Sequence, residues 1–196
     1  MKQVREYLRG HLERALRPLA YLLLYLHVKP NQISVVGTLL NIVTGTLVVA
    51  EYPMSAAILY LVAGSCDLLD GMVARLAHRT TPFGAFLDST LDRISEGVVF
   101  TAVAYWFASQ GLPFEAALVV LALLGSFMVS YTRARAEAAG CECLVGIVTR
   151  AERGPLLAIG LFFGVLPEIM YIIVALTSVT VAQRVLHTHR ELRAGG

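Results

Sequence analysis

Residues 67–92 read DLLDGMVARLAHRTTPFGAFLDSTLD, and this stretch decides how the chain folds. It holds four aspartates: Asp67, Asp70, Asp88 and Asp92. The first two are three residues apart and the last two are four apart, so each pair shares one face of a helix. Pro82 interrupts the chain between the pairs, because proline cannot continue a helix. We therefore expect two antiparallel helices joined by a short link, with the two pairs of carboxylates facing each other.

The composition is that of a membrane protein. Of the 196 residues, 57% are hydrophobic and 15% are charged, whereas about 25% are charged in a soluble domain. We expect an all-α integral membrane protein with a single domain over residues 1–196. It would consist of a juxtamembrane segment (1–29) and a catalytic bundle of six transmembrane helices (30–187). The net charge of +2 does not suggest a nucleic-acid partner.

Six apolar segments are candidates for crossing a bilayer, which takes about 20 residues. They are residues 32–50, 54–74, 84–108, 113–132, 154–166 and 168–186. Lysines and arginines are concentrated in the N-terminal segment and in every second connection. This pattern places both termini and the aspartates on the cytoplasmic side of the cell membrane. Residues 3–16 predict an amphipathic helix resting on the cytoplasmic leaflet, and no cleavable signal peptide is expected.

The aspartates need a compensating charge in such a chain. An aspartate at the centre of a membrane helix costs about 2.5–3.5 kcal/mol on insertion scales. Mg²⁺ and Mn²⁺ prefer oxygen ligands, and four facing carboxylates leave room for one or two such ions, an arrangement that suits displacement at phosphorus. Two alternatives stay open from the residues alone. The aspartates could pair with arginines nearby in the sequence (Arg75, Arg79 and Arg93), or they could line a cation transporter or channel.

Small residues and one arginine accompany the aspartates. Gly71 and Ala74 would let a ligand approach the backbone closely, and Gly84 would do so at the start of the next helix. Arg75 could bind a phosphate oxygen.

A second group of arginines lies at the cytoplasmic ends of the later spans: Arg133, Arg153 and Arg184. They could converge on the phosphate of a soluble acceptor, or they could only fix the orientation of the spans.

The pattern D-x2-D-G-x2-A-R-x8-G-x3-D-x3-D over residues 67–92 resembles, position for position, the signature of the CDP-alcohol phosphotransferase family. The six predicted spans and the amphipathic helix before them are also similar to that family. The resemblance implies transfer of a substituted phosphoryl group from a CDP-linked donor to an alcohol, with release of CMP. It also implies a homodimer, which is common in the family.

The resemblance further implies a role for each matched residue. The ligands of the Mg²⁺ or Mn²⁺ ions would be Asp67, Asp70, Asp88 and Asp92. The residues that bind the CDP-linked lipid would be Gly71, Ala74, Arg75 and Gly84. Asp92 would, in addition, be the general base that takes the proton of the acceptor hydroxyl.

The later part of the chain resembles the inositol-phosphate branch of this family, the phosphatidylinositol-phosphate synthases of actinobacteria and the archaetidylinositol-phosphate synthases of archaea. The similar segments are residues 130–140, Arg150 with Arg153, and Gln183 with Arg184. By this resemblance the acceptor is a phosphorylated polyol, inositol 1-phosphate, whose phosphate is held by Arg133, Arg153 and Arg184. Glycerol 3-phosphate as acceptor and CDP-inositol as donor are the alternatives within the family.

Overall fold

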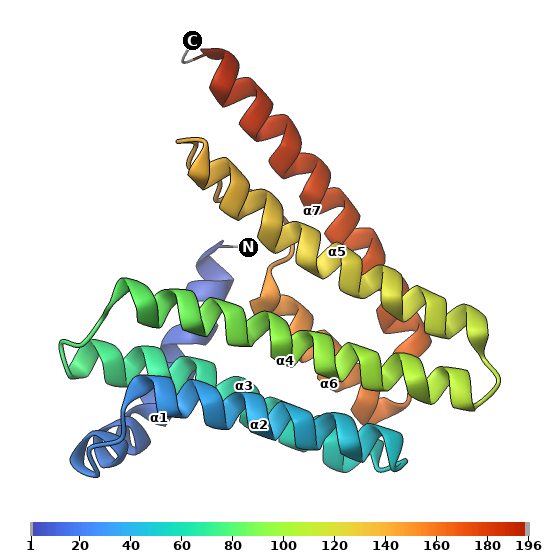
Figure 1. Cartoon of the computed structure of the whole chain (residues 1–196), viewed down its shortest axis with the longest axis horizontal. Coiled ribbons are helices and arrows are strands. Elements are labelled where there is room, and N and C mark those ends of the chain that lie inside the picture. Colours follow the sequence, from blue (N-terminus) through green and yellow to red (C-terminus); the bar gives the residue numbers. More distant parts are fainter. Residues whose placement is uncertain (1, 195–196) are drawn as a thin grey trace.

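A computed structural model describes the backbone of residues 2–194 and the side chains of Tyr7 and residues 10–193. Within this range the chain forms seven helices and no strand (Figure 1), which confirms the all-α prediction. The helices are α1 (Lys2–Tyr25), α2 (Pro30–Val49), α3 (Pro53–Leu76), α4 (Pro82–Ser109), α5 (Pro113–Ala138), α6 (Arg150–Phe163) and α7 (Leu166–Ala194).

Prolines determine where four of the helices begin. The first residues of α2, α3, α4 and α5 are Pro30, Pro53, Pro82 and Pro113. Proline suits this position because the N–H that it lacks has no partner at a helix start. The start of α4 is also capped, since the backbone N–H of Gly84 donates to the Thr81 hydroxyl at 3.0 Å. The predicted break at Pro82 is therefore present, and it separates the two aspartate-bearing helices.

Four of the described helices are long and apolar enough to cross a membrane: α2, α3, α5 and α7. Two of the six predicted spans correspond to helices that do not meet this measure. The last 18 residues of α4 still include Asp92, Arg93 and Glu96, and α6 has only 14 residues. Large apolar side chains on the outside of the bundle are exposed, among them Leu39, Leu61 and Leu121, as a surface in contact with lipid requires.

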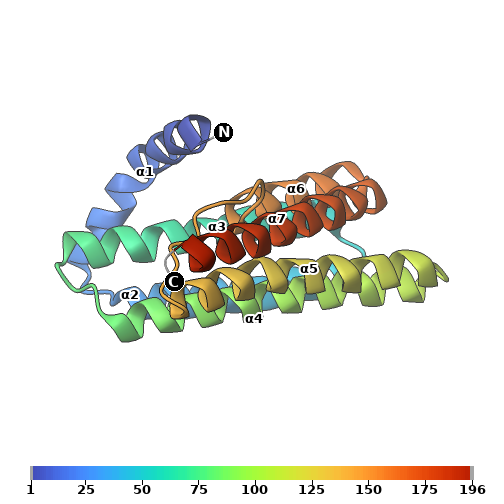
Figure 2. The ribbon, with the colours of Figure 1, turned by 90° about the horizontal axis from the view of Figure 1, so that it is seen from above.

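The long helices run side by side (Figures 1 and 2). Helix α2 packs against α3 and α4, α5 packs against α4 and α7, and α6 lies between α3 and α7. Helix α1 leaves the bundle at a steep angle, close to the link between α3 and α4 (Figure 2). This arrangement places α3 and α4, which carry the aspartates, on either side of α2.

The main core is formed by the halves of the helices that are remote from the aspartates. Val99, Phe100, Val103 and Phe107 of α4 are fully buried there against residues of α2, α3, α5, α6 and α7. Close van der Waals packing of these side chains fixes how the helices are aligned. The aspartate-bearing halves of α3 and α4 lie beyond it, where the helices leave room for polar groups.

A second, smaller cluster attaches α1 to the bundle. Ala20 of α1 is buried together with Ile33 of α2 and Leu69 and Val73 of α3. The helix is longer than the 3–16 predicted, and its second half is held by α3. The side chains of residues 2–6, 8 and 9, which contribute to its predicted amphipathic character, lie outside the described residues.

Candidate metal and phosphate site

Carboxylates from α3 and α4 meet at one guanidinium group. Arg150, the first residue of α6, places Nη1 2.9 Å from Asp67 Oδ2, and the same nitrogen contacts Asp92 Oδ1. Asp67 belongs to α3 and Asp92 to α4, so the structure brings together one member of each predicted pair. The spacing predicts that the two pairs face each other, and the structure joins Asp67 to Asp92 through Arg150.

The other two aspartates differ in their surroundings. Asp70 is buried, and its Oδ2 accepts a hydrogen bond of 2.5 Å from Ser34 Oγ in the first turns of α2. Asp88 is half-buried on α4, one turn before Asp92. Four helices therefore contribute to the aspartate-bearing region: α3 and α4 supply the carboxylates, α2 supplies a hydroxyl and α6 supplies a cation.

Arg150 is firmly charged in this position. Its guanidinium, which stays protonated in proteins, lies against carboxylates of opposite charge. Arg93 is a weaker neighbour, with Nη1 3.9 Å from Asp92 Oδ2. Of the three arginines near the aspartates in the sequence, Arg75 instead pairs with Glu13 of α1 at 3.2 Å.

The donor set suits a hard divalent cation. Within residues 2–194, no three carboxylate, thiol or imidazole groups stand together as a ready set of metal ligands. Two of the aspartates are directed to Arg150 and a third to Ser34. Since oxygens of Asp67 and Asp92 reach a single nitrogen, one cation can contact carboxylates of both helices. All four groups offer the oxygen ligands that Mg²⁺ and Mn²⁺ prefer.

The residues predicted to bind the CDP donor line the end of α3 and the start of α4. A Cβ atom added at Gly71 would lie 3.3 Å from Arg75 Nη1, so the Arg75 side chain lies over the position that a side chain at residue 71 would take. Ala74 lies in the last turn of the same helix. Gly84 belongs to the first turn of α4, where an added Cβ would lie 3.5 Å from Asn31 Oδ1 of α2.

The three arginines of the predicted acceptor site have different partners. Arg153 is buried and makes a two-bonded ion pair with Glu96 of α4, at 2.9 and 3.0 Å, while its Nη1 has no partner among the described groups. Arg184 is buried and donates to the carbonyl oxygens of Val145, at 3.0 Å, and Val129.

Arg133 is half-exposed and pairs with Glu137, one turn further along α5, at 2.7 Å. Its charge and that of Arg153 act electrostatically on Arg184, so the three groups lie in one region.

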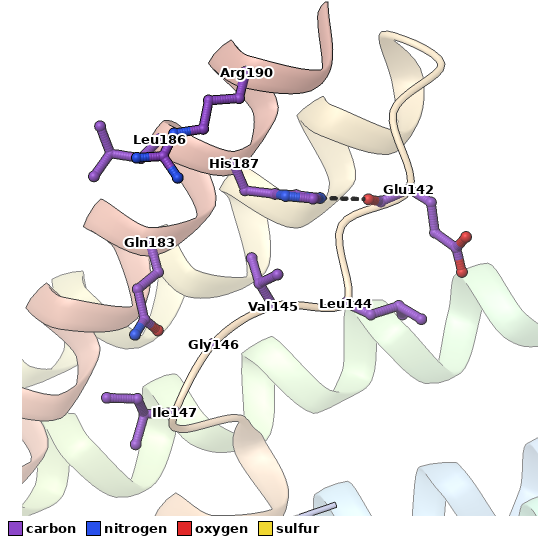
Figure 3. Close-up of a pocket in the computed structure, with 9 residues that line it drawn as sticks. All are labelled: Glu142, Leu144, Val145, Gly146, Ile147, Gln183, Leu186, His187 and Arg190. Atoms are coloured by element: carbon purple, nitrogen blue, oxygen red, sulfur yellow. Dashed lines mark hydrogen bonds between the residues drawn. The ribbon is translucent and has the colours of Figure 1, made fainter. Parts of the chain in front are cut away.

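A cavity of about 680 Å³ lies next to this region, between residues 142–147 and the last turns of α7 (Figure 3). His187 Nε2 donates to the Glu142 carbonyl oxygen at 3.1 Å and ties the loop to α7. The loop contacts α7 closely, because a Cβ at Gly146, whose φ is +133°, would meet Thr180 Cγ2 at 2.6 Å. None of the predicted site residues lines this cavity.

The sequence does not predict the contacts that two residues make with the aspartates. Arg150 enters the prediction only as the partner of Arg153 in a resembling segment, and Ser34 is expected to cap a helix or to contact the nucleotide. Their contacts join residues 83 positions (67 to 150) and 36 positions (34 to 70) apart in the chain. Spacing within one helix carries no information about such partners, although both residues are polar and both lie at helix starts.

The comparisons with known proteins concern nearly the whole chain. The sequence model of the family described as CDP-alcohol phosphatidyltransferase matches residues 27–186, which include all of α3 and α4. The archaetidylinositol phosphate synthase of Pyrococcus horikoshii is 33% identical over 196 residues, covering 100% of both chains.

Solved structures are similar as well. The crystal structure of the Mycobacterium tuberculosis phosphatidylinositol phosphate synthase with CDP-DAG bound has a TM-score of 0.83. It is 28% identical, over 89% of this chain and 94% of that chain. The crystal structure of the same protein in complex with manganese and citrate has a TM-score of 0.78, with 28% identity over 87% of each chain.

Proposed function

Because this chain belongs to the CDP-alcohol phosphatidyltransferase family, we propose that it transfers a phosphatidyl or archaetidyl group from a CDP-linked lipid to inositol 1-phosphate and releases CMP. The observation that carries the proposal is the convergence of Asp67 and Asp92, from two helices, on one point of positive charge. The relatives named for this reaction, and the mycobacterial structure that contains CDP-DAG, support the choice of substrates.

The metal site would be formed by the four aspartates of α3 and α4: Asp67, Asp70, Asp88 and Asp92. We propose Mg²⁺ or Mn²⁺ as the metal, with two ions, because four carboxylates from two helices exceed what one small cation needs. When bound, such ions neutralise the pyrophosphate and stabilise the CMP that leaves. The manganese in the mycobacterial relative supports this assignment.

The protein groups would then carry the rest of the reaction. Asp92 takes the proton of the acceptor hydroxyl, whose oxygen forms a bond to the lipid-side phosphorus while the bond from that phosphorus to CMP breaks. Gly71, Ala74 and Gly84 leave space for the nucleotide, and Arg75 binds a pyrophosphate oxygen. Glu13 holds the Arg75 guanidinium near the end of α3. Because the Arg75 side chain is already restrained, it loses less conformational freedom when the pyrophosphate binds.

The acceptor would be recognised by its phosphate. Arg133, Arg153 and Arg184 lie in one region, and the Arg153 Nη1 is buried without a partner of its own. A buried donor of this kind gains a charge-assisted hydrogen bond from a phosphate oxygen. Glu96 accepts hydrogen bonds from the other two nitrogens of Arg153, Nε and Nη2, and so fixes the direction of Nη1.

The proposal includes a topology. Six spans, α2 to α7, would cross the cell membrane, with both termini and the aspartates on the cytoplasmic side and with α1 on the inner leaflet. The arginines of the connections and the exposed apolar surface support this arrangement. A homodimer would be the functional form.

The experiment that tests the function is CMP release by the purified protein in detergent. The donors are CDP-diacylglycerol and its ether analogue, and the acceptors are inositol 1-phosphate, glycerol 3-phosphate, inositol and serine. We expect CMP only with inositol 1-phosphate and a divalent cation, and none after chelation. CMP with glycerol 3-phosphate alone would contradict the acceptor assignment. The absence of CMP with every donor and acceptor would contradict the proposed reaction.

A further inference from the structure

Arg150 contacts two of the four carboxylates that the proposed function assigns to the metal. Its Nη1 is shared between Asp67 and Asp92, while Ser34 contacts Asp70. A divalent cation that joins α3 to α4 needs the same oxygens, at about 2.1 Å for Mg²⁺. The guanidinium nitrogen and the metal cannot both occupy the space between Asp67 and Asp92.

The backbone of Arg150 is fixed more firmly than its side chain. The Glu152 carboxylate accepts hydrogen bonds from the Thr149 N–H and hydroxyl, at 2.7 and 2.6 Å, and closes the first turn of α6. One turn on, the buried Arg153–Glu96 pair attaches α6 to α4. The Arg150 side chain, by contrast, is about one-third exposed. Its long flexible stem can therefore move without a shift of the helix.

We infer that Arg150 is an internal counter-cation that competes with the divalent metal for Asp67 and Asp92 and is released when the metal binds. The inference rests on the proposed function for the identity of the metal site. A released guanidinium remains next to the carboxylates and carries a free positive charge toward the phosphates of the substrates. Metal binding and phosphate binding are then linked, and each strengthens the other.

Removing the charge of Arg150 tests the competition directly. The measurement is a Mn²⁺ titration of the purified protein, followed by the electron paramagnetic resonance signal of free Mn²⁺. Arg150→Gln should bind Mn²⁺ more tightly than the wild type, on the order of tenfold, because no guanidinium has to be displaced. Arg150→Lys keeps the charge and should remain within about threefold of the wild type.

Arg93→Gln is the matched control, since it also removes one positive charge beside Asp92. Arg93 lies 3.9 Å from that carboxylate, too far for a hydrogen bond. Its effect on Mn²⁺ affinity should be clearly smaller than that of Arg150→Gln. Equal effects would show that only the general electrostatic field matters, and unchanged or weaker Mn²⁺ binding by Arg150→Gln would equally overturn the inference.

A second measurement uses the wild-type protein and does not depend on the folding of a variant. An arginine-reactive phenylglyoxal should modify Arg150 several-fold faster in the presence of Mn²⁺, as followed by mass spectrometry of peptides. Arg153, which is buried against Glu96, is the internal reference and should not change. Slower or unchanged modification of Arg150 would overturn the inference, whereas wild-type protein that releases no CMP would contradict the proposed function itself.

Discussion

At individual positions, side chains of the same type have different surroundings, and these surroundings indicate different roles. Asp70 is buried against a hydroxyl, whereas Asp92 contacts a guanidinium and remains half-buried near the start of α4. A general base has to reach its substrate, so the more accessible Asp92 is better placed for this role than Asp70. Arg153 and Arg133 differ in the same way, since one is buried in an ion pair and the other is half-exposed.

Asp92→Asn should abolish most of the turnover, because the amide keeps the shape of the side chain but cannot take a proton. The loss of a general base lowers kcat by about 10²–10⁴-fold. CMP release measures the effect, and Ser89→Ala, one residue after Asp88 on the same helix, is the control that should keep most activity. Near-normal kcat in Asp92→Asn would remove this residue as the base.

Arg133→Ala should raise the KM for inositol 1-phosphate by about tenfold and leave the KM for the CDP donor within twofold. Arg133 is the cleaner probe of the acceptor site, because replacing Arg153 would leave Glu96 buried without a partner and cost about 3–5 kcal/mol of stability. Arg135→Ala, also exposed in the last turns of α5, is the matched control. An equal rise of both KM values would contradict a specific role in acceptor binding.

At the scale of the helices, close contact depends on small residues. Gly125 of α5 faces Thr177 of α7 so closely that an added Cβ would overlap the hydroxyl and lie 3.0 Å from Thr177 Cβ. Thr177 is fully buried, so it has no free space into which it could move. The approach of α5 to α7 brings Arg184 within reach of the Val129 carbonyl oxygen. This helix pair therefore supports the proposed acceptor site.

Gly125→Ala should lower stability by about 1–3 kcal/mol, because the extra methyl group overpacks the α5–α7 contact. Thermal unfolding in detergent measures the change. Gly64→Ala is the control within another long helix, where a Cβ would meet no atom within 4 Å. It should be neutral or raise stability by up to about 1 kcal/mol, as alanine is the better helix former. Equal melting temperatures for the two variants would contradict the close packing.

The amino-acid sequence predicts the helices more accurately than it predicts the contacts between helices. Helix type follows from composition, and helix starts follow from prolines such as Pro82, because both signals are local. The nearness of the two aspartate-bearing helix ends also follows, since only a short link joins Leu76 to Pro82. The Arg153–Glu96 pair joins two helices distant in the sequence, and no local pattern distinguishes it from pairs such as Glu96 with Arg93.

The predicted helix ends were less accurate than the helices themselves. Helix α1 continues to Tyr25, beyond the predicted residue 16, because Ala20 and its apolar neighbours pack on α3. Helix α5 continues to Ala138, six residues past the apolar segment predicted to cross the bilayer. A hydropathy pattern marks where a helix is apolar, whereas its end depends on hydrogen bonds that polar residues can also make.

For the whole molecule, the proposed topology requires that α4 crosses the membrane. Thr80 precedes the start of α4 and Gln110 follows its end, and both residues are exposed. They should lie on opposite faces of the bilayer. Thr80→Cys should react with an impermeant thiol reagent only from the cytoplasmic side, and Gln110→Cys only from the outside. The native cysteines (Cys66, Cys141 and Cys143) are buried, so the unmodified protein gives the background. Labelling of both positions from one side would contradict six spans.

We propose that the four aspartates catalyse transfer of a lipid phosphoryl group to inositol 1-phosphate. The most direct test of this proposal is the movement of radiolabelled inositol 1-phosphate into the lipid phase, by wild-type protein with CDP-diacylglycerol and Mg²⁺. We predict a labelled phospholipid that requires donor and metal, is formed in step with CMP, and is absent with Asp70→Asn. Label that stays in the aqueous phase while CMP is released, or label that enters lipid at the wild-type rate with Asp70→Asn, would contradict the account.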